Sequence, residues 1–265
     1  MKFLHITDIH FLRAYPKAES GYLSIFNEMT SPIEQLKKGL KSVDLREIEA
    51  VLITGDLTEC GDEEDYKQLK AELKALFGEI PMIVTLGNHD HKPAFYKGWL
   101  EIEPSHKPYH TITQIQDVTI IGLDISDEER QDGLITKEHC EWLEKALENV
   151  KGTRTILMIH HHLLPEQANT PSAPYDEAFY KLIEKSHMTA ILCGHAHHNY
   201  TGQFAGKDYF TADNLSFRGI DEGDGVVRFE EYSGFNVCIL EGNKLEVRKV
   251  PTVTDKRLLA KVKFR

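Results

Sequence analysis

The sequence predicts an α/β fold, formed as one domain of 265 residues with two β-sheets inside and helices outside. Three observations support this class. Short apolar runs alternate with amphipathic stretches over residues 2–86, which is the order of parallel strands joined by helices. Each of these apolar runs ends in polar residues. From about residue 199 onward, predicted strands follow one another without helices, and no repeat or linker divides the chain.

The first part of the chain contains three predicted strands, at residues 2–7, 50–54 and 82–86. A segment without regular periodicity, residues 11–30, lies between the first two strands, and we expect it to be a loop. Because helical stretches separate the strands, we expect them to run parallel in one sheet. Their carboxyl ends should then meet at one edge, where parallel sheets carry their sites.

Cap residues mark the helices between these strands. Ser31 and Pro32 predict a helix start, with Ser31 as the N-cap and Glu34 closing a capping box. Asp62 predicts the N-cap of the next helix. Gly78 predicts its end, because glycine readily adopts the backbone conformation of a C-terminal cap.

The rest of the chain is expected to add two helices and a larger set of strands. The basic tail, residues 256–265, is interpreted as a solvated edge, with an interaction surface as the alternative. In chain order the predicted elements are an antiparallel strand pair at 109–115 and 118–124, a helix capped by Thr136, a strand at 155–159, a helix at 176–185, and strands at 190–193, 207–212, 226–232, 235–241 and 244–250.

Composition limits the classes of partner. The formal net charge is -11, so a nucleic-acid polymer is not expected, whereas a small anionic substrate is compatible if local cations offset the field. No apolar run is long enough for a membrane span, and the N-terminus is expected to be a strand rather than a signal peptide. The four isolated cysteines are expected to be reduced. We therefore predict a cytoplasmic protein without a membrane partner, and a homo-oligomer is left open.

Polar side chains with metal-binding capacity follow five of the predicted strands. Neutral imidazole, carboxylate and carboxamide groups suit divalent metals such as zinc, manganese or iron, and the lack of cysteine among them argues against a structural zinc site. The five blocks are Asp8-Ile9-His10, Gly55-Asp56, Gly87-Asn88-His89-Asp90, His160-His161-His162, and Gly194-His195-Ala196-His197-His198.

These blocks supply too many donors for one tetrahedral ion and about enough for two ions with open positions. The candidate ligands are Asp8, His10, Asp56, Asn88, His160, His195 and His197. A carboxylate can bridge two ions, and Asp56 from a central strand is the natural bridge. Two ions about 3.5–4 Å apart can clamp a phosphoryl group and generate a hydroxide that attacks phosphorus at neutral pH. His89 is the candidate to donate a proton to the leaving group or to bind a phosphate oxygen.

The order and spacing of the five blocks resemble the calcineurin-like metallophosphoesterase superfamily, over residues 8–197. Within it, the segments Thr54–Gly61 and His160–Pro165 resemble the bacterial class III phosphodiesterases of cyclic nucleotides and glycerophosphodiesters. The resemblance implies a four-layer α/β/β/α sandwich. It also implies that a first metal is held by Asp8, His10, Asp56 and His197, and a second by Asp56, Asn88, His160 and His195.

Several assignments stay open at this stage. Leu163 stands where these relatives commonly have proline, the loop at residues 11–30 is longer than in compact members, and residues 213–232 match no assignable pattern, so the substrate is left open. A phosphomonoesterase and a non-catalytic binding module on the same fold are the alternative functions. Other open residues are His161 as the ligand in place of His160, His198 and Arg218 as substrate contacts, Asp124 as a structural acid, and Tyr15, Tyr22 and Phe26 as either pocket or packing residues.

Overall fold

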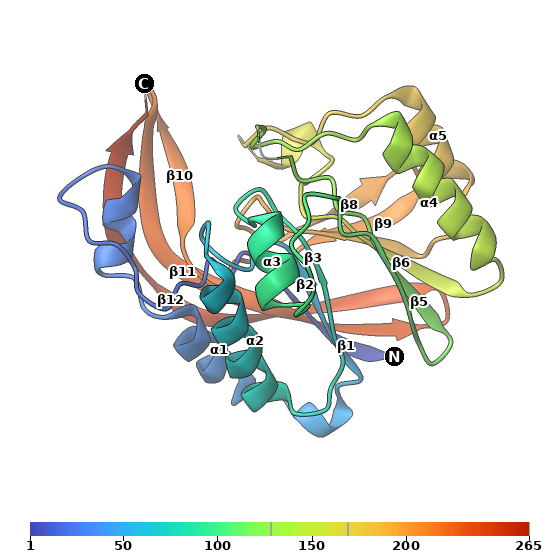
Figure 1. The fold of residues 1–265 in the computed structure, drawn as a ribbon, viewed down its shortest axis with the longest axis horizontal. Helices are drawn as coiled ribbons and strands as arrows, with labels where there is room; N and C mark the ends of the chain where they lie inside the picture. Colours follow the sequence, from blue (N-terminus) through green and yellow to red (C-terminus); the bar gives the residue numbers. More distant parts are fainter. Residues whose placement is uncertain (128, 169, 265) are drawn as a thin grey trace.

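The computed structural model describes residues 1–127, 129–168 and 170–264. Two mixed β-sheets lie face to face and helices cover their outer faces (Figure 1), which confirms the predicted fold class. Among the described residues, no helix has the length and apolarity needed to cross a membrane.

The first sheet has the strand order β10-β11-β1-β2-β3, with β12 paired to β11. Strands β1, β2 and β3 run parallel, as predicted, whereas β11 is antiparallel to β1, so the sheet is mixed. Its strands are β1 (Lys2–Ile6), β2 (Ala50–Thr54), β3 (Met82–Thr85), β10 (Arg218–Gly223), β11 (Val226–Glu241) and β12 (Lys244–Lys263).

The second sheet has the order β4-β5-β6-β7-β9-β8. Its four central strands are parallel, and β4 and β8 are antiparallel at the two edges. The predicted antiparallel pair is thus confirmed, whereas β8 was not predicted. The strands are β4 (Thr111–Ile115), β5 (Val118–Gly122), β6 (Arg154–Met158), β7 (Ala190–Cys193), β8 (Tyr200–Phe204) and β9 (Lys207–Thr211).

Alternating side chains of the strands separate three hydrophobic layers. On β1, Leu4 and Ile6 pack toward the outer helices, whereas Phe3 packs between the sheets. On β6, Leu157 faces the other helix layer and Ile156 faces the first sheet. Helices α1 (Pro32–Leu40), α2 (Glu63–Phe77) and α3 (Lys92–Gly98) cover the first sheet, and α4 (Lys137–Asn149) and α5 (Glu177–Lys185) cover the second.

Most predicted caps are confirmed. Asp62 forms a capping box at the start of α2, and Gly78 ends that helix with a positive φ of 60°. The capping box predicted for α1 is wrong. The Ser31 side chain makes no cap hydrogen bond, and Glu34 pairs with Lys37, one turn further along the helix, rather than with the backbone of Ser31.

The C-terminal strands differ most from the prediction. The strands expected at 226–232 and 235–241 are one strand, β11, with an irregular register between Phe229 and Gly234. Residues 256–263 of the tail interpreted as a solvated edge continue β12 and pair with the start of β11, and Arg265 lies outside the described residues. Together with β10 these segments form an arm that projects from the sandwich (Figure 1).

The segment 11–30, expected to be a loop, contains a short 3-10 helix, η1 (Tyr22–Asn27), that packs against the arm. Phe26 lies in a cluster with Phe217 and Phe229, and Tyr15 and Tyr22 pack at its margin. Packing is therefore the main role of these aromatic residues. Tyr22 also has a polar contact, described below, that reaches the candidate metal site.

A pH effect on stability follows from His5, which is fully buried and bonded through Nε2 to Thr54 Oγ1, 2.9 Å away. Burial lowers the pKa of His5 to about 3. Below pH 6.5 the unfolded chain binds a proton that the folded protein does not, so acid should destabilise the fold. Between pH 6.5 and 5 we expect the metal-free wild type to lose about 2 kcal/mol of unfolding free energy more than His5→Gln. Urea unfolding at both pH values measures this, and parallel losses would contradict it.

Candidate metal centre

The five polar blocks lie at the carboxyl ends of β1, β2, β3, β6 and β7. Backbone hydrogen bonds join them directly: Asp8 N donates to Gly55 O, and Gly194 N donates to His160 O. The first of these bonds lies within the first sheet and the second within the second sheet. Between the sheets, His195 N donates to Asp8 Oδ2 over 3.1 Å and His160 Nδ1 bonds to the carbonyl of Thr54 over 2.7 Å. The blocks of both sheets therefore converge, as the strand-end pattern predicted.

Left-handed backbone marks this convergence. Positive φ is uncommon for residues other than glycine and costs about 1–3 kcal/mol each where it is sterically strained. The surrounding loops must hold these residues in place, which is typical of functional sites. Five candidate ligands have positive φ: Asp8 (51°), His10 (47°), Asp56 (48°), His195 (67°) and His197 (51°).

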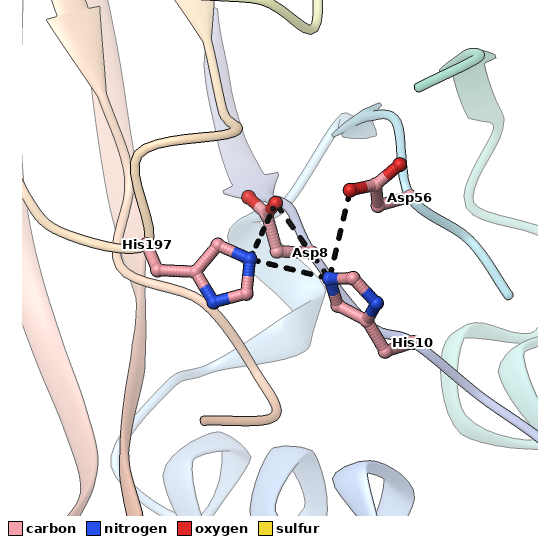
Figure 2. A group of neighbouring side chains, drawn as sticks. All are labelled: Asp8, His10, Asp56 and His197. Carbon is pink, nitrogen blue, oxygen red and sulfur yellow. Dashed lines mark hydrogen bonds and ion pairs between the residues drawn. The ribbon is translucent and has the colours of Figure 1, made fainter. Parts of the chain in front are cut away.

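Four side chains form the first cluster (Figure 2): Asp8, His10, Asp56 and His197. His197 Nε2 lies 3.1 Å from Asp8 Oδ1, and His10 Nε2 lies 3.5 Å from Asp56 Oδ2. The two Nε2 atoms of His10 and His197 are 3.2 Å apart. This is the set implied for the first metal.

The hydrogen bonds of the two imidazoles show why they could hold a cation. His10 Nδ1 donates to Glu59 Oε2 at 2.6 Å, and His197 Nδ1 donates to the carbonyl of Phe217 at 2.5 Å. With Nδ1 protonated, each neutral ring presents an Nε2 lone pair. Two lone pairs and the carboxylates of Asp8 and Asp56 then face one space, an arrangement that a cation would stabilise.

The second cluster contains Asp56, His160 and His195. His160 Nδ1 donates to the carbonyl of Thr54 at 2.7 Å, which leaves Nε2 directed at Asp56 Oδ2 and Asn88 Oδ1, each 3.2 Å away. Here again, donor atoms for a metal face one another. Asp56 belongs to both clusters, as expected for a bridging carboxylate.

The donor set fits two metal ions. Two buried polar atoms, Asp8 Oδ1 and His195 Nε2, have no hydrogen-bond partner, and such atoms are costly unless something binds them. Without a cation, protons on the histidine rings balance the carboxylate charges. Burial alone would lower the pKa of His160, but the charge of Asp56 raises that pKa to about 9, so the ring is protonated at neutral pH. Metal ions would displace these protons.

Glu59 is a residue that sequence reasoning missed. Its buried carboxylate accepts from His10 Nδ1 through Oε2 and from His89 Nδ1 through Oε1, the latter at 3.1 Å. The Tyr22 hydroxyl also donates to Oε2, at 3.2 Å. Burial opposes ionisation, but the bonds from His10 and His89 lower the pKa of Glu59 to about 2. The available signal was an acid three residues after Asp56.

His89 stands beside the metal ligands. Its backbone N donates to Asp56 Oδ1 at 2.9 Å, which places the ring next to both clusters. Burial alone would lower the pKa of His89, but the charges of Asp56 and Glu59 raise it well above the ordinary value. His89 is therefore held as an imidazolium, the form that can donate a proton.

Asp90 stabilises the loop that carries Asn88 and His89. Its carboxylate accepts from the backbone N–H groups of Gly87, Leu57 and Thr58 and from the Tyr66 hydroxyl. Asp90 therefore connects the loop after β3 to the loop after β2.

The remaining candidates lie outside the two clusters. His161 is buried against His160 and His195, and neither of its ring nitrogens has a partner. His198 Nδ1 bonds to the carbonyl of Ala196 at 2.9 Å. The guanidinium of Arg218 lies over the ring of Tyr232, 5.7 Å from its centroid. Asp124 accepts from Tyr109 N and Ser126, a structural role.

Comparison with known families agrees with this geometry. A model of the calcineurin-like phosphoesterases matches residues 1–199, about three-quarters of the chain. The chain belongs to this family. Its fold normally binds a dinuclear metal centre, which accords with the two clusters that share Asp56.

Curated relatives of this family member include phosphodiesterases. A cAMP/cGMP dual specificity phosphodiesterase of Mycobacterium tuberculosis is 27% identical over 77% of this chain and 64% of its own length. A glycerophosphodiester phosphodiesterase of Enterobacter lignolyticus is 27% identical over 74% of this chain and 71% of its own length. The match therefore spans about two-thirds of the length of these relatives.

Solved structures share the fold at low identity. A Thermus thermophilus protein gives a TM-score of 0.57 at 15% identity, covering 94% of this chain and 98% of that chain. GAP50, the anchor in the inner membrane complex of Plasmodium, gives 0.60 at 15% identity, covering 99% and 88%. At this identity the likeness shows the fold alone.

A cavity of about 390 Å³ adjoins the centre of this phosphoesterase. Asn88 and His89 form part of its wall, so a group bonded to a phosphorus atom at the metal clusters could extend into it. Lys92 is the one lysine or arginine among the described residues of the lining. Its ammonium group donates to the carbonyl and the hydroxyl of Ser126 and lies 3.5 Å from Asp124 Oδ2.

Gly87 packs so closely against Asp56 that there is no space for a side chain at this position. A Cβ there would lie 2.2 Å from Asp56 Oδ1 and 2.6 Å from Asp56 N, and the backbone atom cannot move easily. We expect Gly87→Ala to displace the Asp56 carboxylate, weaken metal binding about 10-fold or more, and destabilise the fold by about 1–3 kcal/mol. Metal titration and thermal unfolding measure the two effects. Gly219→Ala in the arm is the control, and equal behaviour of the two variants would contradict this account.

Proposed function

We propose that this protein hydrolyses small phosphodiesters of the cyclic-nucleotide or glycerophosphodiester type. The observation that carries the proposal is the pair of ligand clusters sharing Asp56, with His89 beside them. Membership of the phosphoesterase family and the names of the curated relatives support it.

Each part of the centre would have a distinct role. Asp8, His10, Asp56 and His197 would hold one ion, and Asp56, Asn88, His160 and His195 the other. Two such ions supply Lewis-acid stabilisation of phosphoryl oxygens and a nucleophile at neutral pH. The chain itself supplies the proton: His89, held as an imidazolium by Asp56 and Glu59, donates it from the ring to the leaving oxygen.

The charge of the cavity favours a diester over a monoester. A monoester carries about one more negative charge at neutral pH, because its second pKa is near 6. Of the described lining residues, His89 is the imidazolium assigned to proton transfer, and Lys92 is the one lysine or arginine, which Ser126 and Asp124 already engage. Asp127 adds an acid to the same lining. A diester carries an uncharged ester group, such as a glycerol or nucleoside moiety, where a monoester has its second phosphoryl charge, and the uncharged group suits this environment better.

The test compares two chromogenic substrates on the purified protein loaded with Mn²⁺, Zn²⁺ or iron. We expect kcat/KM for bis(p-nitrophenyl) phosphate to exceed that for p-nitrophenyl phosphate, and a cyclic nucleotide and a glycerophosphodiester to be hydrolysed. The reverse preference would support the monoesterase. No hydrolysis of any substrate, with metal stoichiometry near zero, would support a binding module.

A further inference from the structure

Gln131, in the segment between β5 and α4, contacts a candidate metal ligand. Asn88 Nδ2 donates a hydrogen bond to Gln131 Oε1 over 2.8 Å. On its other side, Asn88 directs Oδ1 at His160 Nε2, 3.2 Å away. The two ends of one carboxamide are therefore engaged by two different parts of the chain.

The orientation of this carboxamide decides whether Asn88 can bind a metal. The oxygen has lone pairs for a cation, whereas the NH₂ group has only hydrogens to offer. A rotation of 180° about the terminal bond would exchange the two and close the second cluster to an ion. In the structure Gln131 Oε1 accepts from the NH₂ group, and this bond stabilises the orientation in which Oδ1 faces His160.

The segment carrying Gln131 is fixed at several points. Leu134 N donates to the carbonyl of Ile125, and Arg130 Nε donates to the carbonyl of Gly133. Gly133 lies against His161: a Cβ there would be 2.9 Å from the His161 ring, and its φ is +62°. The segment thus packs directly on the histidine beside His160, which holds Gln131 at the second cluster.

We propose that Gln131 is a positioning residue for the second metal ion. It orients Asn88 so that Oδ1 completes the site formed with Asp56, His160 and His195. This inference rests on the proposed function, since it assumes an ion in the second cluster. Groups that orient metal ligands in this way typically change metal affinity 10–100-fold when they are removed.

The experiment titrates Mn²⁺ into metal-free protein and resolves two dissociation constants, with Gln203→Leu on β8 as the control for loss of an exposed glutamine. Gln131→Met removes the acceptor at nearly constant length, and we expect the second dissociation constant to rise about 10-fold while the first stays unchanged. Gln131→Glu can only accept, so it preserves the orientation of Asn88, and we expect it to retain wild-type affinity or tighter.

Three results would overturn the proposal: an unchanged second constant in Gln131→Met, an equal weakening in Gln131→Glu, or an equal loss at both sites. Thermal unfolding of each variant shows whether a loss comes from misfolding. Failure of the proposed function is a separate observation, because it is read from substrate hydrolysis by the wild type. A wild type that binds two ions without hydrolysing phosphodiesters leaves the test of Gln131 intact.

Discussion

Asp56→Asn should reduce kcat/KM for a phosphodiester by roughly 10³-fold or more, about 4 kcal/mol of transition-state stabilisation. Asp56 is the one residue common to the two clusters, with Oδ2 3.2 Å from His160 Nε2 and 3.5 Å from His10 Nε2. Asparagine keeps the shape but loses the charge and one of the two acceptor oxygens. Neither ion would then be held at full strength, and the bridge between them would be lost.

Metal analysis should accompany the kinetics of this variant. We expect stoichiometry to fall from two ions toward one or none at a metal concentration that saturates the wild type. Asp124→Asn is the matched control, because Asp124 is also a buried aspartate after a strand yet lies outside both clusters. It should keep two ions. Two fully occupied sites and wild-type rates in Asp56→Asn would rule out the bridging role.

The strand-end pattern made most of the candidate centre predictable. A parallel sheet brings the carboxyl ends of its strands together, so Asp8, Asp56 and Asn88 could be expected to meet before any coordinates were known. In extended backbone, the two-residue spacing of Asp8 and His10 would place both side chains on one side of the chain. That expectation is wrong, because both residues have left-handed backbone, with φ of 51° and 47°.

The contacts that orient the ligands could not be predicted, because they join distant parts of the chain. Glu59 bonds to His10 across 49 positions, and Gln131 bonds to Asn88 across 43. Neither belongs to a strand-end block with the spacing of metal ligands. The arm could not be predicted for a different reason. The pairing register of β11 shifts between Phe229 and Gly234, and this shift interrupts the alternation of side chains by which one continuous strand is recognised.

His89→Gln should reduce the rate in proportion to how poor the leaving group is. His89 contacts both Asp56 and Glu59, but it is not a ligand in either of the two clusters that share Asp56. Two ions should therefore still bind to the variant. For an alkoxide leaving group we expect a loss of about 10²–10⁴-fold, the usual worth of a positioned general acid. For p-nitrophenolate, which leaves without a proton, the loss should be far smaller.

Glu59→Gln should lower the rate less than His89→Gln does, and the size of its effect should depend on pH. The charge of Asp56 and the hydrogen bond and charge of Glu59 raise the pKa of His89 against the effect of burial, so the imidazolium persists through neutral pH and is lost only as the pH rises through that raised pKa. Removing the charge should move the alkaline fall of kcat for an alkoxide substrate to lower pH, with a smaller loss at pH 6, where His89 still carries its proton. Rates measured from pH 6 to 10 with both substrate types test this. An equal loss for alkoxide and p-nitrophenolate substrates would mean that His89 binds the phosphoryl group instead of protonating the leaving oxygen.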